Sequence, residues 1–444
     1  MSAAVAPAGT GDAIAFVREL TWAAVPPVVK RQLAWALLDL LAVSVAGRPA
    51  PAAGIAADHA QEAHGGDAAT ALLDGRRLSV PGAAWANGVL ANVLDYDDGH
   101  RLTKGHPGAI VIPAALAAAE AADATLEELL TAIVVGYEIA IRAGVQQHAR
   151  APEYHASGSW GALGAAAAAG RLLGLDADGL RRAVGLAEYH APIAPIMRSV
   201  ADPAMTKDAT GWGAFVGTSS VLLARRGYTS LESGFLLEAD VRDLGERWAL
   251  LELYVKRYPC CRWTQPAIEA SLALQGDRPF ALEAVRGVTI RTFAAADGLA
   301  RKQPATTEDA QYSLVWPVAA ALARGRFGVE DVLGDFEDPG VAALADRTVV
   351  VVDPELTQAF PARRAAEVTV ELTDGRTLAS GVVEAPGDPG DPGWEAVVER
   401  KVRDHLAAGP GPAVQTIEPP DRRLGGLALD DLMQTLTYAL GERR

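Results

Sequence analysis

The spacing of apolar residues predicts α-helices through most of the first half of the chain. In residues 28–45, leucines recur at helical spacing and form one wide apolar stripe, which ends at Gly47 and Pro49. Alanine-rich stretches with the same periodicity follow, and their small side chains allow neighbouring helices to pack closely. The pattern predicts helices from residue 80 onward and over residues 112–122, 126–144, 161–173 and 177–188.

The pattern changes near residue 252, where apolar and polar residues begin to alternate as they do in β-strands. We predict a mainly α protein with a large all-helical domain (residues 1–251), an inserted smaller α+β lid domain (residues 252–390) and a C-terminal return to the helical domain (residues 391–444). The predicted strands are residues 284–293, 348–352, 366–372 and 377–383, and the predicted helices of this half are residues 309–325, 394–406 and 427–440.

The composition excludes several classes of protein. A net charge of −15 over 444 residues argues against nucleic-acid binding, and no uncharged apolar run is long enough for a membrane span. Residues 1–11 lack the pattern of a secretory signal. The two cysteines, Cys260 and Cys261, are adjacent, so we expect neither a disulfide nor an iron–sulfur cluster. The cytoplasm is therefore the expected compartment.

Titratable side chains concentrate in residues 95–106, between two apolar helical stretches. Catalytic sites gather such groups because neighbouring charges and burial adjust their pKa values. A local excess of cations can also attract an anionic substrate to an acidic protein. We expect Asp97 and Asp98 to bond turn amides or to pair with Arg101. The other members of this segment are Asp95, His100, Lys104 and His106.

Five segments, taken together, carry a resemblance to a known family. They read LDYDDGHRLTKGHPGA (94–109), YHASGSWGALGAAAAAGRLLGLD (154–176), MTKDATGWGAFVG (205–217), KRYPCCRWTQPAIEA (256–270) and DAQYSLVWPVAAAL (309–322). In this order they resemble the MmgE/PrpD family, which includes 2-methylcitrate dehydratase, cis-aconitate decarboxylase and an iminodisuccinate epimerase. The resemblance implies a helical domain with an α+β lid, a homodimer, a small polycarboxylate substrate, and acid–base chemistry without a cofactor or metal.

The same resemblance assigns roles to particular residues. His106 and His155 match two histidines of the family site, and imidazoles suit proton transfer because they titrate near neutral pH. Asp95 matches an aspartate that orients a histidine or takes a proton itself, and Lys207 and Lys256 match cations for substrate carboxylates. The alternative for each histidine is a structural role, which for His106 is to cap the helix that follows.

Three further residues complete the predicted substrate-binding set. Lys104 either lines the mouth of the cleft or is simply solvated, and Arg262 is another candidate cation. The family more often has a tyrosine where this chain has Trp316, and an indole cannot donate a proton as a phenol does. We therefore expect Trp316 to reshape the pocket. We do not expect Cys260 or Cys261 to act as a nucleophile.

These parts suit more than one reaction. Dehydration of a citrate-like acid requires a base, an acid for the leaving hydroxide and cations for the carboxylates, so a lyase of the 2-methylcitrate dehydratase type is the leading hypothesis. Decarboxylation of a cis-aconitate-like acid comes second, and epimerisation or isomerisation of a dicarboxylate such as iminodisuccinate comes third. The fourth hypothesis is a non-catalytic protein that binds small acids. It gains weight if His106 and His155 do not share one cavity with Lys207 and Lys256.

Overall fold

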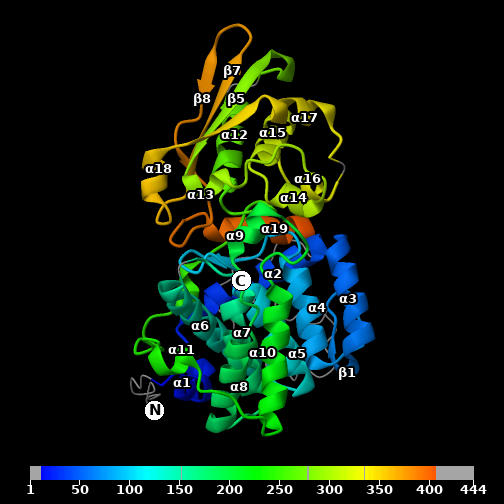
Figure 1. Cartoon of the computed structure of the whole chain (residues 1–444), viewed down its shortest axis with the longest axis vertical. Helices are drawn as coiled ribbons and strands as arrows, with labels where there is room; N and C mark the ends of the chain where they lie inside the picture. The colour runs from blue at the N-terminus through cyan, green and yellow to red at the C-terminus, as the bar shows by residue number, and fades with distance from the viewer. Residues whose placement is uncertain (1–11, 152, 278–279, 335, 407–444) are drawn as a thin grey trace, which may run out of the picture.

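The protein consists of two stacked regions, which Figure 1 shows one above the other. The computed structural model describes residues 12–151, 153–277, 280–334 and 336–406. The lower part, which we call the helical region, contains residues 12–252 together with the last described helix. The upper part, which we call the sheet region, contains residues 255–390. The protein is therefore mainly α, as the apolar spacing predicts.

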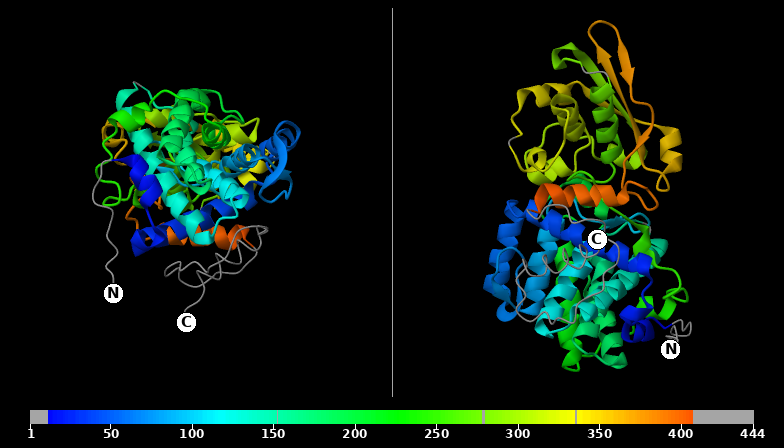
Figure 2. Two further views of the ribbon diagram at one scale, coloured as in Figure 1. Left: turned by 90° about the horizontal axis from the view of Figure 1, so that it is seen from below. Right: turned by 180° about the vertical axis from the view of Figure 1, so that it is seen from behind.

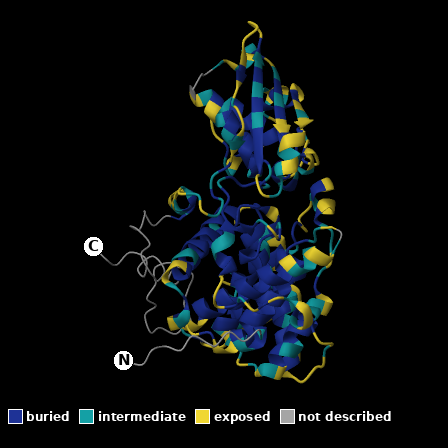
Figure 3. Ribbon diagram, turned by 90° about the vertical axis from the view of Figure 1, so that its left-hand side faces the viewer, coloured by how far each residue is buried: buried dark blue, intermediate teal, exposed yellow. Residues whose placement is uncertain are grey.

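The helical region is built from closely packed helices whose small residues allow the backbones to approach. A Cβ atom on Gly164 of α7 would lie 2.4 Å from the carbonyl oxygen of Gly136 on α6, so only glycine fits at this crossing. Figure 3 shows that buried residues, in dark blue, occupy the centre of this region. Its helices are α1 (Ala13–Glu19), α2 (Pro27–Gly47), α3 (Pro51–His64), α4 (Val80–Asn92), α5 (Gly108–Ala121), α6 (Leu126–Arg150), α7 (Gly158–Leu172), α8 (Ala177–His190), α9 (Ile196–Ala201), α10 (Thr210–Arg225) and α11 (Gly234–Glu238).

Two pairs of short strands in this part of the chain were not predicted. Strands β1 (Gly65–Thr70) and β2 (Arg77–Leu78) form an antiparallel pair beside α3 and α4. Strand β3 (Gly99–His100) lies within the titratable segment and pairs antiparallel with β4 (Leu253–Tyr254), which leads into the sheet region. The second pair ties residues 95–106 to the boundary between the two regions.

The sheet region contains a five-stranded sheet in the order β6-β5-β7-β8, with β9 also paired to β7. Strand β5 (Val285–Thr292) runs parallel to β6 (Thr348–Val352) and antiparallel to β7 (Ala365–Leu372). The predicted strand at 377–383 is two shorter strands, β8 (Thr377–Ala379) and β9 (Val383–Glu384). The helices of this region are α12 (Gln265–Asp277), α13 (Ala294–Asp297), α14 (Thr307–Gln311), α15 (Val315–Arg324), α16 (Glu330–Leu333), α17 (Pro339–Asp346) and α18 (Pro354–Ala359).

The predicted helix at 309–325 is broken at residues 312–314, between α14 and α15. Pro317 has no N–H to donate to the carbonyl of Ser313, and its ring would clash with that carbonyl in a continuous helix. Thr264 donates its hydroxyl to the Ser313 carbonyl instead, at 3.0 Å. The Ser313 hydroxyl accepts the N–H of Trp316 at 3.0 Å and so helps to start α15. Tyr312 lies at this break, as the residue that ends α14.

The last described helix, α19 (Trp394–His405), returns to the helical region and packs against α2. It is the orange helix at the boundary of the two regions in the right-hand view of Figure 2. Its Lys401 ammonium is buried, 2.7 Å from the Asp39 carboxylate of α2 and 2.7 Å from the Tyr96 carbonyl oxygen. The predicted helix at 427–440 and the N-terminal residues 1–11 lie outside the described residues.

The most apolar helices of the described chain are core helices. Almost every residue of α5 is buried, and so is most of α2. Within the described ranges, no single helix is both long and apolar enough to cross a bilayer. Helices α2 and α3 reach that length and apolarity only as a pair, and they meet at an angle of 96°.

Candidate active site

A cavity with an empty volume of about 580 Å³, its open mouth included, lies at the boundary between the two regions. Residues of both regions line it, so the site depends on how the regions meet. The helical region contributes Asp95, Arg101, Lys104, His106 and Asp208 to the lining. Tyr254 of β4 and residues of the sheet region, namely Lys256, Cys261, Arg262, Tyr312 and Arg364, complete its polar part.

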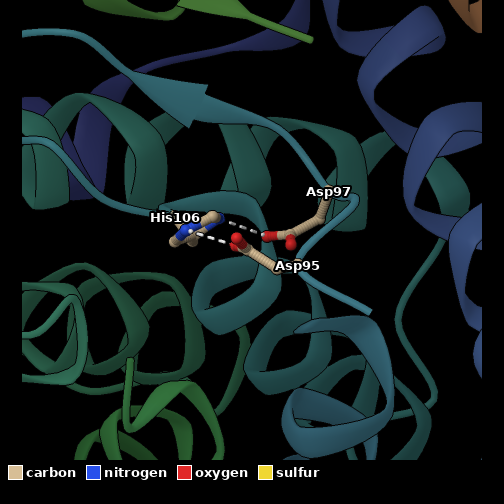
Figure 4. Close-up of side chains that lie close together, drawn as sticks. All are labelled: Asp95, Asp97 and His106. Carbon is tan, nitrogen blue, oxygen red and sulfur yellow. Dashed lines mark hydrogen bonds and ion pairs between the residues drawn. The ribbon is translucent and has the colours of Figure 1, made fainter. Parts of the chain in front are cut away.

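His106 is held between two aspartates at the wall of this cavity (Figure 4). Its Nδ1 lies 3.1 Å from Asp97 Oδ2, and its Nε2 lies 3.2 Å from Asp95 Oδ1. Nδ1 also lies 3.1 Å from the carbonyl oxygen of Asp98, and the His106 backbone N–H donates to Ser157 Oγ at 2.9 Å. The imidazole is thus fixed in position, with Nε2 on the side of the cavity-lining Asp95.

Asp98, and not His106, caps the helix that follows. The backbone N–H of Gly108, the first residue of α5, donates to Asp98 Oδ1 at 3.1 Å, and Tyr137 donates its hydroxyl to Asp98 Oδ2 at 2.5 Å. Burial raises the pKa of Asp98 to about 7, and the charge of Asp97 adds to this rise. The expected pairing with Arg101 does not form, because that side chain donates to the Ala362 carbonyl at 3.1 Å.

The surrounding carboxylates favour the protonated form of His106. Burial alone would favour the neutral imidazole, but Asp97 and Asp208 outweigh this effect and raise the pKa of His106 to about 9. The imidazole is therefore a cation at neutral pH, with both ring nitrogens protonated. In this state His106 can donate a proton or bind an anion, and it cannot accept a proton.

Lys256 reaches the same cluster from the sheet region. Its ammonium donates to Asp95 Oδ1 at 2.5 Å and to the Asp95 carbonyl at 2.8 Å, and the side chain is 1% exposed. Burial would lower the pKa of Lys256, but Asp95 raises it above its usual value, so the ammonium stays charged. The backbone φ of Asp95 is +50°, and Lys104 (+49°) and Lys207 (+40°) share this left-handed conformation. Non-glycine residues adopt it rarely, and they cluster at functional sites when they do.

Lys207 is buried beside the cavity and is not part of its lining. Its ammonium donates to the Val93 carbonyl at 3.1 Å and to the side chain of Gln311, and burial lowers its pKa. The next residue, Asp208, does line the cavity, where it accepts the Ser157 hydroxyl at 2.7 Å. Sequence reasoning missed Asp208, although it is the neighbour of Lys207 in the MTKD motif.

The two predicted histidines do not meet in one cavity. His155 is half-buried, and its backbone N–H donates to His148 Nε2 at 3.1 Å. The two rings are stacked with their centroids 6.4 Å apart. Residue 155 is absent from the lining that contains His106. The proposed role of His155 in proton transfer stays a prediction, and it would require this wall to move inward when the substrate binds.

Trp316 does not reshape the cavity, contrary to the expectation from the sequence. Its side chain lies in the hydrophobic core of the sheet region, and its indole N–H donates to the Asp331 carbonyl at 3.1 Å. Tyr312, four residues before Trp316 in the same motif, supplies a phenol to the cavity lining. The Tyr312 hydroxyl donates to Asp208 Oδ2 at 3.3 Å, and burial raises its pKa well above the usual value.

The remaining predicted cations, Lys104 and Arg262, both line the cavity. The guanidinium of Arg262 is committed to the chain around it, because it donates to the Ala385 carbonyl at 2.9 Å and to the Pro386 carbonyl at 2.7 Å. Burial raises the pKa of the Cys261 thiol to about 12, which fits the expectation that it is not a nucleophile. Arg364 also lines the cavity, and sequence reasoning missed it because no motif surrounds it.

Among the described residues, one group of side chains is placed so that it could hold a metal ion: Asp95, Asp97 and His106. One ligand atom of each lies within 4.8 Å of the others. A cation at this point would compete with the Lys256 ammonium, which already neutralises Asp95. The group therefore suits proton transfer better than metal binding.

On this mainly α fold, a buried histidine between aspartates beside a cavity rich in cations is a candidate acid–base site. The chain matches the family model of the MmgE/PrpD N-terminal domain over residues 12–240. It matches that of the MmgE/PrpD C-terminal domain over residues 258–418. The protein belongs to the MmgE/PrpD family, as its five motifs predict.

Its curated relatives include several named for one reaction. The cis-aconitate decarboxylase-like protein oryM of Aspergillus oryzae is 26% identical over 427 residues, which covers 86% of this chain and 87% of the relative. The cis-aconitate decarboxylase of Aspergillus terreus is 25% identical over 70% of this chain and 72% of its own length. The human cis-aconitate decarboxylase is 35% identical over 123 residues, 26% of this chain and 25% of the relative.

Proposed function

We propose that the protein is a lyase that removes CO₂ from a tricarboxylic acid of the cis-aconitate type, with His106 as the proton donor. The observation that carries this proposal is the buried His106 imidazole, held between Asp95 and Asp97 with its pKa raised to about 9, in a cavity where cationic side chains outnumber carboxylates. The relatives named for cis-aconitate decarboxylation support the choice of substrate class. Decarboxylation thereby moves ahead of dehydration, which the sequence alone favours.

The charges of the cavity suit an anion with several carboxylates. Cationic side chains outnumber carboxylates in the lining, and both Lys256 and His106 are buried there. A dry, cationic site stabilises negative charge on the substrate more strongly than water-exposed lysines do. The cationic groups are Arg101, Lys104, His106, Lys256, Arg262 and Arg364, and the carboxylates are Asp95 and Asp208.

The reaction balances with one proton. The bond between the substrate's CH₂ carbon and its carboxylate carbon breaks, and CO₂ leaves. The released electron pair forms a new double bond, and the former double-bond pair takes the proton of His106 at the other alkene carbon. Solvent at the cavity mouth then reprotonates the imidazole. Loss of CO₂ requires no base, because the substrate carboxylate itself supplies the electrons.

Dehydration and epimerisation require a group that removes a proton from carbon. Among the lining groups of the described chain, the carboxylates next to His106 are Asp95 and Asp208. Asp95 is paired with Lys256 and with His106, and Asp208 accepts two hydroxyl hydrogen bonds, so both carboxylates already have partners. A proton donor beside carboxylates that are already engaged is the pattern expected of a decarboxylase.

The proposal is tested by incubating the purified protein with cis-aconitate, 2-methylcitrate, citrate and iminodisuccinate in deuterated water, followed by NMR. We expect CO₂ release from cis-aconitate only, with one deuterium at the carbon that takes the proton. Loss of water from 2-methylcitrate or citrate would instead support a dehydratase. Proton exchange without loss of a group would support an epimerase, and binding without any change would support the non-catalytic reading.

The His106→Gln variant tests whether turnover depends on the His106 imidazole. We expect it to bind tricarboxylates but to lose at least about a hundredfold in turnover, which is the usual effect of removing a general acid. His59→Gln is the matched control, because His59 is exposed on α3 and does not line the cavity. Equal turnover in both variants would remove His106 from the mechanism.

A further inference from the structure

Arg364 precedes β7 and is buried in the cavity wall with one donor unused. Its side chain is 5% exposed, and its Nε–H has no hydrogen-bond partner in the described chain. One Nη donates to Asp388, and the guanidinium carbon lies 4.5 Å from the centre of the Tyr254 ring. A buried guanidinium with an unused donor next to a cavity is a site prepared for an anion.

The nearby charges do not neutralise this guanidinium. Asp388 is shared, because Arg262 also approaches its carboxylate, at 3.1 Å. Arg262 also donates to the carbonyls of Ala385 and Pro386, so it holds the segment around Asp388 in place. Two buried guanidiniums therefore share one carboxylate, and one positive charge is left without a counterion. A buried charge of this kind is costly unless an anion joins it.

Lys104 faces the same part of the cavity from the helical region. Its ammonium lies 3.2 Å from the centre of the Tyr154 ring, and no ion pair with a carboxylate is found for it in the described residues. Burial lowers the pKa of Lys104 to about 8, and the positive charge of Arg364 contributes to this fall. Two cations, one from each region, thus line the same cavity.

We infer that Arg364 and Lys104 together bind one carboxylate of the substrate, at a subsite of the cavity that does not include Lys256 or His106. This inference rests on the proposed function and deepens it, because it requires three carboxylates in the ligand. Two of these carboxylates bind near His106 and Lys256, and the third binds to Arg364 and Lys104. A planar guanidinium with a free N–H and an ammonium opposite it match the two oxygens of a carboxylate.

Calorimetric binding of two unreactive acids tests the subsite without any turnover. Tricarballylate has three carboxylates, and methylsuccinate differs from it only in having hydrogen in place of one terminal carboxylate. We expect the wild-type protein to bind tricarballylate at least about tenfold more tightly than methylsuccinate, since a charged hydrogen bond has about this effect on affinity. In Arg364→Met, the affinity for tricarballylate should fall to that for methylsuccinate, which should itself change by less than about twofold.

Arg363→Met is the matched control. Arg363 is the neighbour of Arg364 in the sequence, but its side chain is 62% exposed and pairs with Glu384. It should leave both affinities unchanged. Lys104→Met approaches the subsite from the other wall and should show the same selective loss, which keeps the test valid if Arg364→Met does not fold. An equal loss for both acids, or no loss, would overturn the subsite. If the subsite behaves as expected but cis-aconitate is not decarboxylated, the proposed function fails and the subsite stands.

Discussion

Asp97 offers a way to change the protonation of His106 without altering the cavity wall, because Asp97 is buried behind the imidazole and does not line the cavity. In Asp97→Asn an amide replaces the carboxylate at nearly the same volume. The new amide N–H needs an acceptor, and Asn92 provides one. Asn92 donates to Asp97 Oδ1 at 2.8 Å, and its own Oδ1 is buried without a partner, so a rotated Asn92 amide accommodates the change.

The expected effect follows from the charges around the imidazole. The pKa of His106 is about 9, and each pKa unit corresponds to about 1.36 kcal/mol, so the folded protein favours the imidazolium by about 3 kcal/mol relative to a free histidine. Asp97 is the carboxylate that contributes most to this rise. An opposite charge within hydrogen-bond distance moves a pKa by about one to three units, and we expect Asp97→Asn to lower that of His106 by about two.

Two measurements follow the change. In an NMR titration, the His106 imidazole should titrate near pH 9 in the wild type and near pH 7 in Asp97→Asn, about two units lower. The free energy of unfolding should respond too, because a raised folded pKa stabilises the protein below the unfolded value of about 6.5. This stabilisation is lost as the pH rises through about 9 in the wild type, and it is small at every pH in the variant.

The control is Asp67→Asn, which changes an exposed aspartate of β1 that does not contact His106. This control should leave the pKa of the His106 imidazole unchanged. If Asp97→Asn left the His106 titration unchanged, the Asp97 carboxylate would not be the cause of the raised pKa of His106. The assignment of His106 as an acid at neutral pH would then lose its physical basis.

Two more predictions concern the histidines and the buried ion pair. His106→Ala and His155→Ala are both expected from the sequence to reduce turnover at least about a hundredfold. A loss in His106→Ala alone would support the cavity as the structure shows it, while equal losses would require His155 to move inward on substrate binding. Lys401→Met should destabilise the protein by about 3–5 kcal/mol in urea unfolding, because it leaves the Asp39 carboxylate buried without a counterion. Adding Asp39→Asn should recover most of that loss, and no recovery would refute this cause.

The fold could be predicted from the sequence where one local pattern determines an element. Helix α8 begins at Ala177 and strand β6 covers Thr348–Val352, both as the periodicity predicts. The break between α14 and α15 was missed, although Pro317 was visible, because the apolar pattern continues across it. The pairing of β3 with β4 joins residues about 150 apart, and two-residue strands have no periodicity to recognise.

The candidate site divides in the same way. The segment around Asp95 and His106 could be found because its charges are adjacent in the sequence. Arg364 could not be found, since no motif surrounds it and it reaches the cavity only through the contact between the two regions. Tyr312 stands in a motif that was recognised, but Trp316 of the same motif was taken as the cavity residue instead. Trp316 was misplaced because matching a motif identifies a position in the chain, while the direction of its side chain depends on the helix break before it.

The two regions supply different parts of the chemistry. The acid, His106, is held entirely by the helical region, through Asp95, Asp97 and Ser157. The sheet region supplies three of the six cationic groups of the lining, Lys256, Arg262 and Arg364, together with the phenol of Tyr312. The position of the acid can therefore stay constant while substitutions in the sheet region change which carboxylates are bound and where. For this reason, the residues that select the substrate should be sought first among those of the sheet region that line the cavity, beginning with Arg364.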